Sequence, residues 1–241
     1  MKKGFLLFVA VSLAMSTWAA DLPKQGFGVQ IGWARPILRL NSMSNPASAK
    51  DSLSQVIAMK GFKVGVVYDA SFVKGFGTSL GINYTFGAHT GEWKSVGLYD
   101  YPRSRQMFTY HEIEVFADWQ YKFEVAKETY LILYSGPTIQ CGLGLDMRSD
   151  KQYDLGGEIV SKRYSGYDAN ADANNALTRL NVTWGIGAGF QYQRYFLRGG
   201  YDFGLINPYK NGDFSNGWHT RGRLDQWQIK LGIYLWYADN D

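Results

Sequence analysis

The stretch RLNVTWGIGAGFQY, residues 179–192, decides the fold of this chain. Apolar or aromatic residues occupy every even position from Leu180 to Tyr192, apart from the small Ala188. Glycine, Asn, Thr and Gln fill the odd positions in between. Alternation of this kind is the period of a β-strand that has one apolar face and one small or polar face.

The same period of two recurs in seven other segments, at about residues 26–34, 60–69, 76–88, 109–123, 129–145, 195–205 and 224–237. Short connections near 70–75, 124–128 and 193–194 alternate with long polar ones near 35–58, 89–108, 146–178 and 206–223. This places every short turn and both ends of the barrel sequence at one end of the molecule. We predict an all-β fold, an eight-stranded antiparallel up-and-down transmembrane β-barrel with short periplasmic turns and long extracellular loops.

Two details of this prediction can be checked. Gly136-Pro137 is expected to break the phase of segment 129–145, with a bulge or an end of pairing, because proline donates no N–H to a ladder. Aromatic residues near the ends of the strands are expected to form the interfacial girdles of a membrane barrel. They are Trp33, Tyr68, Phe86, Tyr121, Phe123, Tyr192, Phe203 and Tyr237.

A soluble barrel of the lipocalin type is the competing architecture, since it is also up-and-down and eight-stranded. Its apolar residues would point inward around a ligand. The face opposite the apolar one is rich in Gly, Gln and Asn here, whereas a solvent-facing surface would carry more Lys, Glu and Thr. The pattern therefore favours the membrane barrel.

Composition and the first residues agree with an exported membrane protein. Residues 1–19 combine Lys2 and Lys3 with an apolar run and a small-residue cleavage site after Ala19, the pattern of a signal peptide. Residues 20–241 would then form the barrel domain. A net charge of +4 is too small to suggest a nucleic-acid partner, and a single cysteine excludes an internal disulfide framework.

Four stretches resemble the PorT-like family of outer-membrane β-barrel proteins of Gram-negative bacteria. They are GFKVGVVYDASFVKGFGTSLGINYTF (61–86), YHEIEVFADWQYKF (110–123), TYLILYSGPTIQCGL (129–143) and NVTWGIGAGFQYQRYFLRGGYDFGLINPYK (181–210). The resemblance implies a cell outer-membrane location and a role in secretion or cell-surface assembly. The chain departs from many outer-membrane proteins at its end, where Tyr237 is followed by four further residues.

The inward faces of the expected strands carry eight charged residues. They are Lys63, Glu112, Glu114, Asp118, Lys122, Arg198, Asp202 and Lys230. Buried charges are tolerable only when they are paired and hydrogen-bonded, and an eight-stranded barrel is just wide enough for side chains to fill. We expect a structural polar network of four acids and four bases rather than a pore.

Sites for chemistry are weakly supported by the sequence. His89, His111 and His219 lie near the expected loop side, so an outer-leaflet lipid-modifying enzyme with a rim histidine is the alternative function. A metal site of His89, His111 and Asp100 is a further alternative. Asp168, Asn170, Asp172 and Asn174 loosely resemble a calcium loop, without its glycine and terminal glutamate.

The expected function is non-enzymatic: a structural or surface-interaction barrel with no catalytic residue, cofactor or metal. Its expected partners are outer-membrane lipid, the barrel-assembly and periplasmic chaperone machinery, and a protein at the extracellular loops, where exposed aromatics such as Trp93 and Trp218 could form a binding surface.

Overall fold

The computed structural model describes residues 25–44, 55–73, 75–95, 102–153, 157–165, 167, 177–209 and 219–238. The expected signal peptide, residues 1–19, lies outside them. Eight long strands form a wall: β1 (Gln25–Ser44), β3 (Lys60–Val73), β4 (Phe76–Thr90), β6 (Arg103–Ala126), β7 (Thr129–Gln152), β9 (Leu180–Tyr192), β10 (Tyr195–Gly204) and β11 (His219–Ala238). Three shorter strands add to it: β2 (Gln55–Ala58), β5 (Lys94–Ser95) and β8 (Ile159–Ser165).

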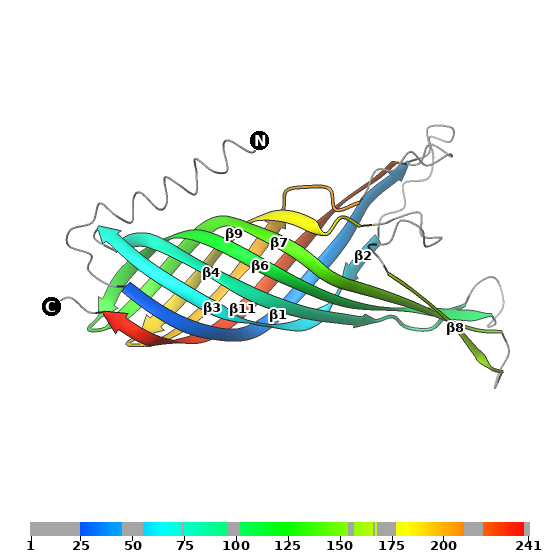
Figure 1. Ribbon diagram of the computed structural model, residues 1–241, viewed down its shortest axis with the longest axis horizontal. Helices are drawn as coiled ribbons and strands as arrows, with labels where there is room; N and C mark the ends of the chain where they lie inside the picture. The colour runs from blue at the N-terminus through cyan, green and yellow to red at the C-terminus, as the bar shows by residue number, and fades with distance from the viewer. Residues whose placement is uncertain are drawn as a thin grey trace.

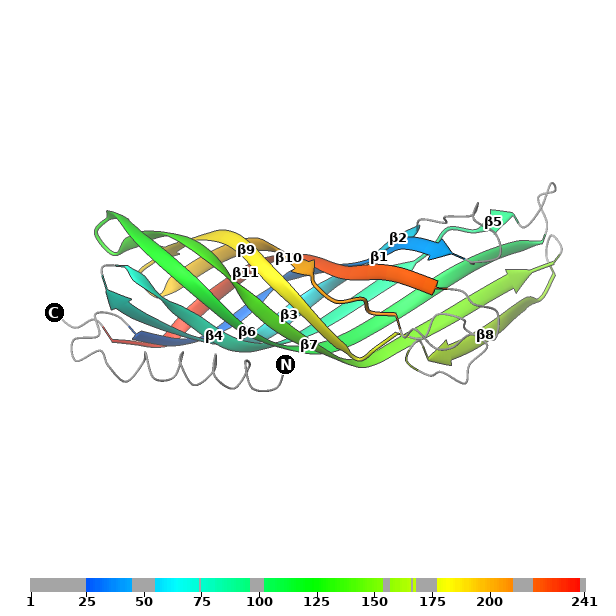
Figure 2. The same ribbon diagram turned by 90° about the horizontal axis from the view of Figure 1, so that it is seen from above.

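The wall closes on itself. Each long strand pairs antiparallel with the next one along the chain, and β11 pairs antiparallel with β1 from Gln25↔Ala238 to Ser44↔His219. Figures 1 and 2 show the resulting tilted barrel from two directions. The predicted eight-stranded up-and-down barrel is confirmed.

All short turns lie at one end, together with the start of β1 and the end of β11 (Figure 1). Gly75, Glu128 and Gln193 each adopt a positive φ in the connections β3–β4, β6–β7 and β9–β10. Tight hairpin connections need such left-handed residues. The short–long alternation read from the sequence is therefore present in the structure.

The strands run much further at the opposite end than the sequence pattern indicates. β6 and β7 have 24 residues each, although about 9–11 tilted residues span a bilayer. Parts of the expected loops 35–58, 89–108, 146–178 and 206–223 are strands, among them the outer half of β1 and all of β8. Figure 2 shows β6, β7 and β8 projecting far beyond the rest of the wall. We call this projecting part the extracellular extension.

The predicted change of phase at Gly136-Pro137 is wrong, whereas the predicted interruption of pairing is confirmed on the β6 side of the strand. Alternate residues of β7 remain buried from Tyr130 to Gln140, and the register with β9 is continuous. On the β6 side, pairing stops after Phe116↔Thr138 and resumes at Trp119↔Ser135 in the same register. Ala117 would face Pro137 there, and proline has no N–H for that ladder. The proline therefore removes hydrogen bonds on one side of β7, and the residues of the strand keep their faces.

Inward glycines and inward aromatic rings complement one another inside the barrel. A Cβ atom at Gly232 would lie 2.1 Å from the ring of Phe196. The rings of Phe116, Tyr134 and Tyr234 lie in the same way against Gly81, Gly187 and Gly26. Each ring fills the space that a side chain on the neighbouring strand would occupy. The glycine-rich face that the sequence shows therefore makes room for the rings that fill the barrel.

Replacement of Gly232 by Val should lower the free energy of unfolding by about 1–3 kcal/mol, because the buried Phe196 ring has nowhere to move. Gly144→Val is the matched control, since a Cβ there meets only the His111 ring at 3.6 Å. Urea titration in detergent measures the free energy of unfolding of both variants, after heat-modifiable gel mobility has shown that each is folded. Equal stability of the two variants would contradict this packing.

Candidate functional site: a sealed interior below an extracellular extension

The outer wall of the barrel is an apolar belt. Large hydrophobic side chains alternate outward on every long strand, and Ile31 and Leu231 are 60% and 56% exposed. Belt residues include Phe27, Trp33, Phe62, Val64, Ile82, Val115, Phe123, Leu133, Trp184, Ile186, Leu197 and Ile229. Water-soluble monomers do not expose a continuous apolar surface of this extent. The molecule is an eight-stranded transmembrane β-barrel. The lipocalin-like alternative is wrong because the apolar faces point outward.

Seven of the eight expected girdle aromatics lie on the outward-facing rows of their strands. Tyr237 does not. A bulge in the pairing of β1 with β11, between Phe27 and Gly28, changes the face of the last residues of β11. Tyr237 consequently stacks on the buried Tyr234, with ring centroids 5.4 Å apart, instead of facing lipid.

The first polar cluster inside the barrel is centred on Asp69. One oxygen of its carboxylate accepts from Arg198 at 2.6 Å and from Lys122 at 3.0 Å, and it also accepts from the Tyr234 hydroxyl. Arg198 donates further to Ser79 at 2.6 Å and to Gln120 at 3.2 Å. All these side chains are buried. The two cations are thus desolvated and held by one carboxylate, which fixes β3, β6, β10 and β11 against each other.

A second cluster is centred on Glu114, further along the barrel. Its carboxylate accepts from Lys63 at 2.5 Å, from Gln226 at 2.7 Å and from Thr85 at 3.0 Å. Lys63 also donates to Gln228, whose amide in turn donates to Asp202. This chain of hydrogen bonds crosses the barrel from β3 to β10 and occupies its middle.

The other expected interior charges lie in the same space. Asp118 and Lys230 are buried, and the Lys230 ammonium lies 4.8 Å from the centre of the Phe116 ring. Glu112, fully buried, accepts from the Tyr110 hydroxyl. All eight residues expected to face inward are buried. The expected balance of four acids and four bases is incomplete, however, because Asp69 is a fifth buried acid that faces the interior.

An apolar cluster of buried residues lies above this network. Its buried members are Met59, Phe108, Tyr110, Leu145, Tyr167, Leu177, Tyr209 and Leu224. A gap of only about 20 Å³ remains among them. That is room for about one water molecule.

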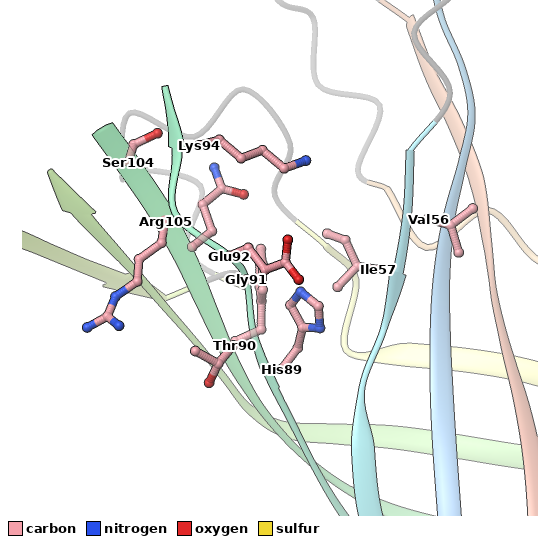
Figure 3. A pocket seen from close by; sticks show the side chains of 11 residues that line it. Val56, Ile57, His89, Thr90, Gly91, Glu92, Lys94, Ser104 and Arg105 are labelled. Atoms are coloured by element: carbon pink, nitrogen blue, oxygen red, sulfur yellow. The ribbon is translucent and has the colours of Figure 1, made fainter. Parts of the chain in front are cut away.

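A larger pocket lies in the extracellular extension, beyond this apolar cluster. It has a volume of about 590 Å³ and is bounded by β2, the end of β4 and the outer half of β6. Figure 3 shows His89, Glu92 and Lys94 gathered around it. Arg105, also at its wall, packs its guanidinium 4.7 Å from the ring centre of Trp93. The pocket is lined by charged side chains, among them Glu92 and Lys94, and by the aromatic Phe108.

His89 and His111 do not form one rim site, and the side chain of His219 lies outside the described part of the structure. His89 faces the pocket, and its Nδ1 lies 3.1 Å from the carbonyl oxygen of Ala58. His111 lies on the outer wall within β6, where its Nδ1 is 2.6 Å from the Tyr84 hydroxyl and its ring packs on Phe86. The expected position of His111 at a strand end is therefore wrong. His111 and His89 therefore lie on opposite faces of the wall.

Other remote alternatives fall outside the structure. Asp100 and the calcium-like segment with Asp168 and Asp172 are not among the described residues. Within the described ranges, no group of three or more His, Cys, Asp or Glu could hold a metal ion. No helix in those ranges is long and apolar enough to cross a membrane.

An ion cluster stabilises the extracellular extension. Asp150 of β7 is fully buried and accepts from Arg148 at 2.7 Å, from Arg105 at 3.1 Å and from Ser161 of β8 at 2.8 Å. Burial opposes ionisation of this carboxyl, but the bonds from Ser161, Arg148 and Arg105 outweigh it and lower its pKa. The charged carboxylate thus ties β6, β7 and β8 together.

The sequence reasoning missed the residues on which these clusters depend. Asp69 shares the inward row of β3 with Lys63 and could have been found from that parity alone. Asp150 lies in a segment that was expected to be a loop, and no period signals its burial.

Comparison with known proteins gives likenesses of architecture at low identity. No family model matches the chain, and no curated protein matches it. Among solved structures, the attachment invasion locus protein Ail of Yersinia pestis is 12% identical, with 90% of this chain and 100% of that chain covered at a TM-score of 0.36. Neisserial surface protein A is 14% identical, with 90% of this chain and 99% of that chain covered at a TM-score of 0.37. The N-terminal β-barrel domain of Pseudomonas aeruginosa OprF is 9% identical, with 87% of this chain and 99% of that chain covered at a TM-score of 0.28. The strand pairing and the apolar outer face, rather than these likenesses, establish the barrel.

Asp69→Asn should lower the free energy of unfolding by about 3–5 kcal/mol, because Lys122 and Arg198 stay buried after their shared counter-charge is removed. Tryptophan fluorescence during urea unfolding in detergent measures the change. Asp146→Asn, at an exposed position of β7, is the control and should change stability by less than about 0.5 kcal/mol. A similar loss in both variants would contradict the central role of Asp69.

Acid should loosen the extracellular extension before the barrel. Since the pKa of Asp150 is lowered in the folded protein, its contribution to stability is complete above the unfolded value of about 3.9 and is lost as the pH falls through the folded value. Amide hydrogen exchange should therefore rise in β8 below about pH 4. Asp150→Asn should show the same rise at neutral pH, and Glu158→Gln should not. Unchanged protection of β8 in Asp150→Asn would refute the assignment.

Proposed function

We propose that this protein is a non-conducting outer-membrane barrel that acts by presenting its extracellular extension to a partner. The observation that carries the proposal is the contrast between the two parts of the wall. Where the wall is apolar outside, charged clusters and aromatic rings fill the interior. Beyond that level the strands continue and enclose a pocket of about 590 Å³. Recognition is therefore possible only outside the membrane.

A structural role for the interior charges supports a closed barrel. Their positions interlock strands that are distant in sequence, as in the bond from Arg198 on β10 to Asp69 on β3. An ion path would need mobile, hydrated side chains, whereas these side chains donate and accept among themselves. The residues Lys63, Glu112, Glu114, Asp118, Lys122, Arg198, Asp202 and Lys230, together with Asp69, are proposed as this structural network.

The partner of the extension is proposed to be a protein at the cell surface. Arg105, Arg148 and Trp93 hold the extension in a fixed shape, and fixed surfaces bind with a smaller entropic cost. The PorT-like resemblance adds a role in secretion or surface assembly, with delivery through a signal peptide, chaperones and the barrel-assembly machinery. Unchanged surface and secreted protein patterns after deletion of the gene would refute that finer role.

The proposal predicts that the purified barrel carries no stable current. Wild type, Arg198→Ala and Glu112→Ala should all give flat recordings in planar bilayers, because loss of one side chain leaves the other layers of the interior in place. Insertion is verified on the same samples by heat-modifiable gel mobility. Reproducible unitary currents from any of the three would overturn the closed barrel.

Orientation is checked on intact cells. Trypsin added outside should cut in the extension, where Lys151, Lys162 and Arg163 are exposed, and should spare the turns that carry Lys127 and Arg194. Permeabilised cells provide the positive control for the turns. Cleavage at Lys127 in intact cells would reverse the proposed orientation.

A further inference from the structure

A cluster of cations lies on the outer face of the wall, directly beyond the apolar belt. It consists of Arg35 and Arg39 on β1, Lys60 on β3, and Arg221 and Arg223 on β11. We call it the arginine patch. The strand register brings these residues together, since Arg39 is paired with Arg223, Ser42 with Arg221, and Ala34 with Gly61 next to Lys60.

Aromatic residues fix the height of the arginine patch relative to the membrane. Arg35 is the cross-strand partner of Trp227, and Trp33, which is 47% exposed, precedes it on the same face of β1. Tryptophan and tyrosine concentrate at the interface between hydrocarbon and headgroups. Arg35 therefore lies at that interface, and Arg39 and Arg223 lie one step beyond it, on the side of the long connections.

The centre of the arginine patch is organised by a buried carboxylate. Asp225 is fully buried, and its Oδ2 accepts from Arg39 at 2.8 Å and from the Tyr201 hydroxyl at 2.9 Å. Arg223 Nε lies 3.0 Å from the same oxygen. The other oxygen accepts from the backbone N–H of Gly204. Two guanidinium groups are thus fixed side by side, although their side chains remain 33% and 42% exposed.

The arginine patch keeps a strong positive charge in spite of Asp225. On the outward rows of β1, β3, β10 and β11, within the described residues, Asp225 is the one acid against five cations. Arg35, Lys60 and Arg221 are exposed. Each guanidinium has five donors in a planar fork, which matches the oxygens of a phosphate group. Such a surface favours a ligand with more than one phosphate charge.

We propose that the arginine patch binds the phosphorylated headgroup of a glycolipid in the outer leaflet. The proposal rests on the proposed membrane location, because only lipid headgroups surround the wall at this height. The acyl chains of the same lipid would lie against the apolar belt below, near Trp33 and Trp227. Arginine makes bidentate contacts to phosphate, and the excess of cations favours a headgroup with net negative charge over a zwitterionic one, in which an ammonium offsets the single phosphate. The buried Asp225 holds the central pair of arginines in place for such contacts.

The test uses the full-length folded protein in neutral detergent with bisphosphorylated lipid A as probe, measured by native mass spectrometry. Arg35→Gln/Lys60→Gln/Arg221→Gln removes three exposed cations and leaves the Asp225 cluster intact. Its affinity for the probe should fall about tenfold or more, as expected for the loss of charge-assisted contacts. Lys94→Gln/Lys151→Gln/Arg163→Gln removes the same charge from the extracellular extension and should bind like wild type.

The remaining arms separate the possible failures. Dephosphorylated lipid A should bind wild type no better than it binds the patch variant, and inorganic phosphate should compete only weakly. Equal affinity of both triple variants, or full displacement by inorganic phosphate, would overturn the lipid site. Heat-modifiable mobility and insertion into phosphatidylcholine vesicles are measured on every sample. If wild type fails to insert, the proposed membrane function fails as well. If it inserts but binds lipid A equally well with and without its phosphates, only the arginine patch proposal fails.

Discussion

The closing ladder between β1 and β11 is the constraint on which the rest of this structure depends. A sheet in hydrocarbon has no water to satisfy a free edge, so the last strand must pair with the first. Antiparallel closure from Gln25↔Ala238 to Ser44↔His219 achieves this and also unites the two ends of the barrel. Once the wall is closed, each side chain must face either lipid or a narrow interior.

The narrow interior explains the composition of the inward rows. Eight strands leave space only for side chains, so bulky rings on one strand require glycine on its neighbour, as Phe196 does at Gly232. Between the rings, buried cations need carboxylates within contact distance. Asp69 and Glu114 each serve several donors and so hold opposite sides of the barrel together. A core of this kind stabilises the barrel, and it is the basis of the proposal that the barrel does not conduct.

The two surfaces proposed for binding both lie where the wall meets water or lipid headgroups. The extracellular extension continues the wall beyond the belt and is held by Asp150 through Arg105 and Arg148. The arginine patch lies lower, where the wall meets the headgroups, and is held by Asp225. In both places a buried carboxylate fixes partly exposed arginines. The same device thus stabilises both the surface proposed for a macromolecular partner and the surface proposed for lipid.

The sequence by itself determined the number of strands, their faces and the end at which the short turns lie. Those features follow from a period of two that lipid on one side and a packed interior on the other impose residue by residue, as in segment 179–192. The pattern ended where the wall leaves the membrane, because both faces then meet water and the alternation loses its apolar half. The outer parts of β1, β6 and β7 were therefore expected to be loops.

Only the tertiary structure decided which inward residues meet. Strand tilt and register bring Asp69 into contact with Arg198, 129 positions away in the sequence, and place Arg39 beside Arg223. Local periodicity does not encode the height of a residue along the barrel, so it does not predict either contact. The face of Tyr237 also depended on register, since a bulge in the pairing of β1 with β11 moves its side chain from one side of the wall to the other. The sequence shows the face of each residue on its strand, whereas the closed ladder sets its height and its neighbours.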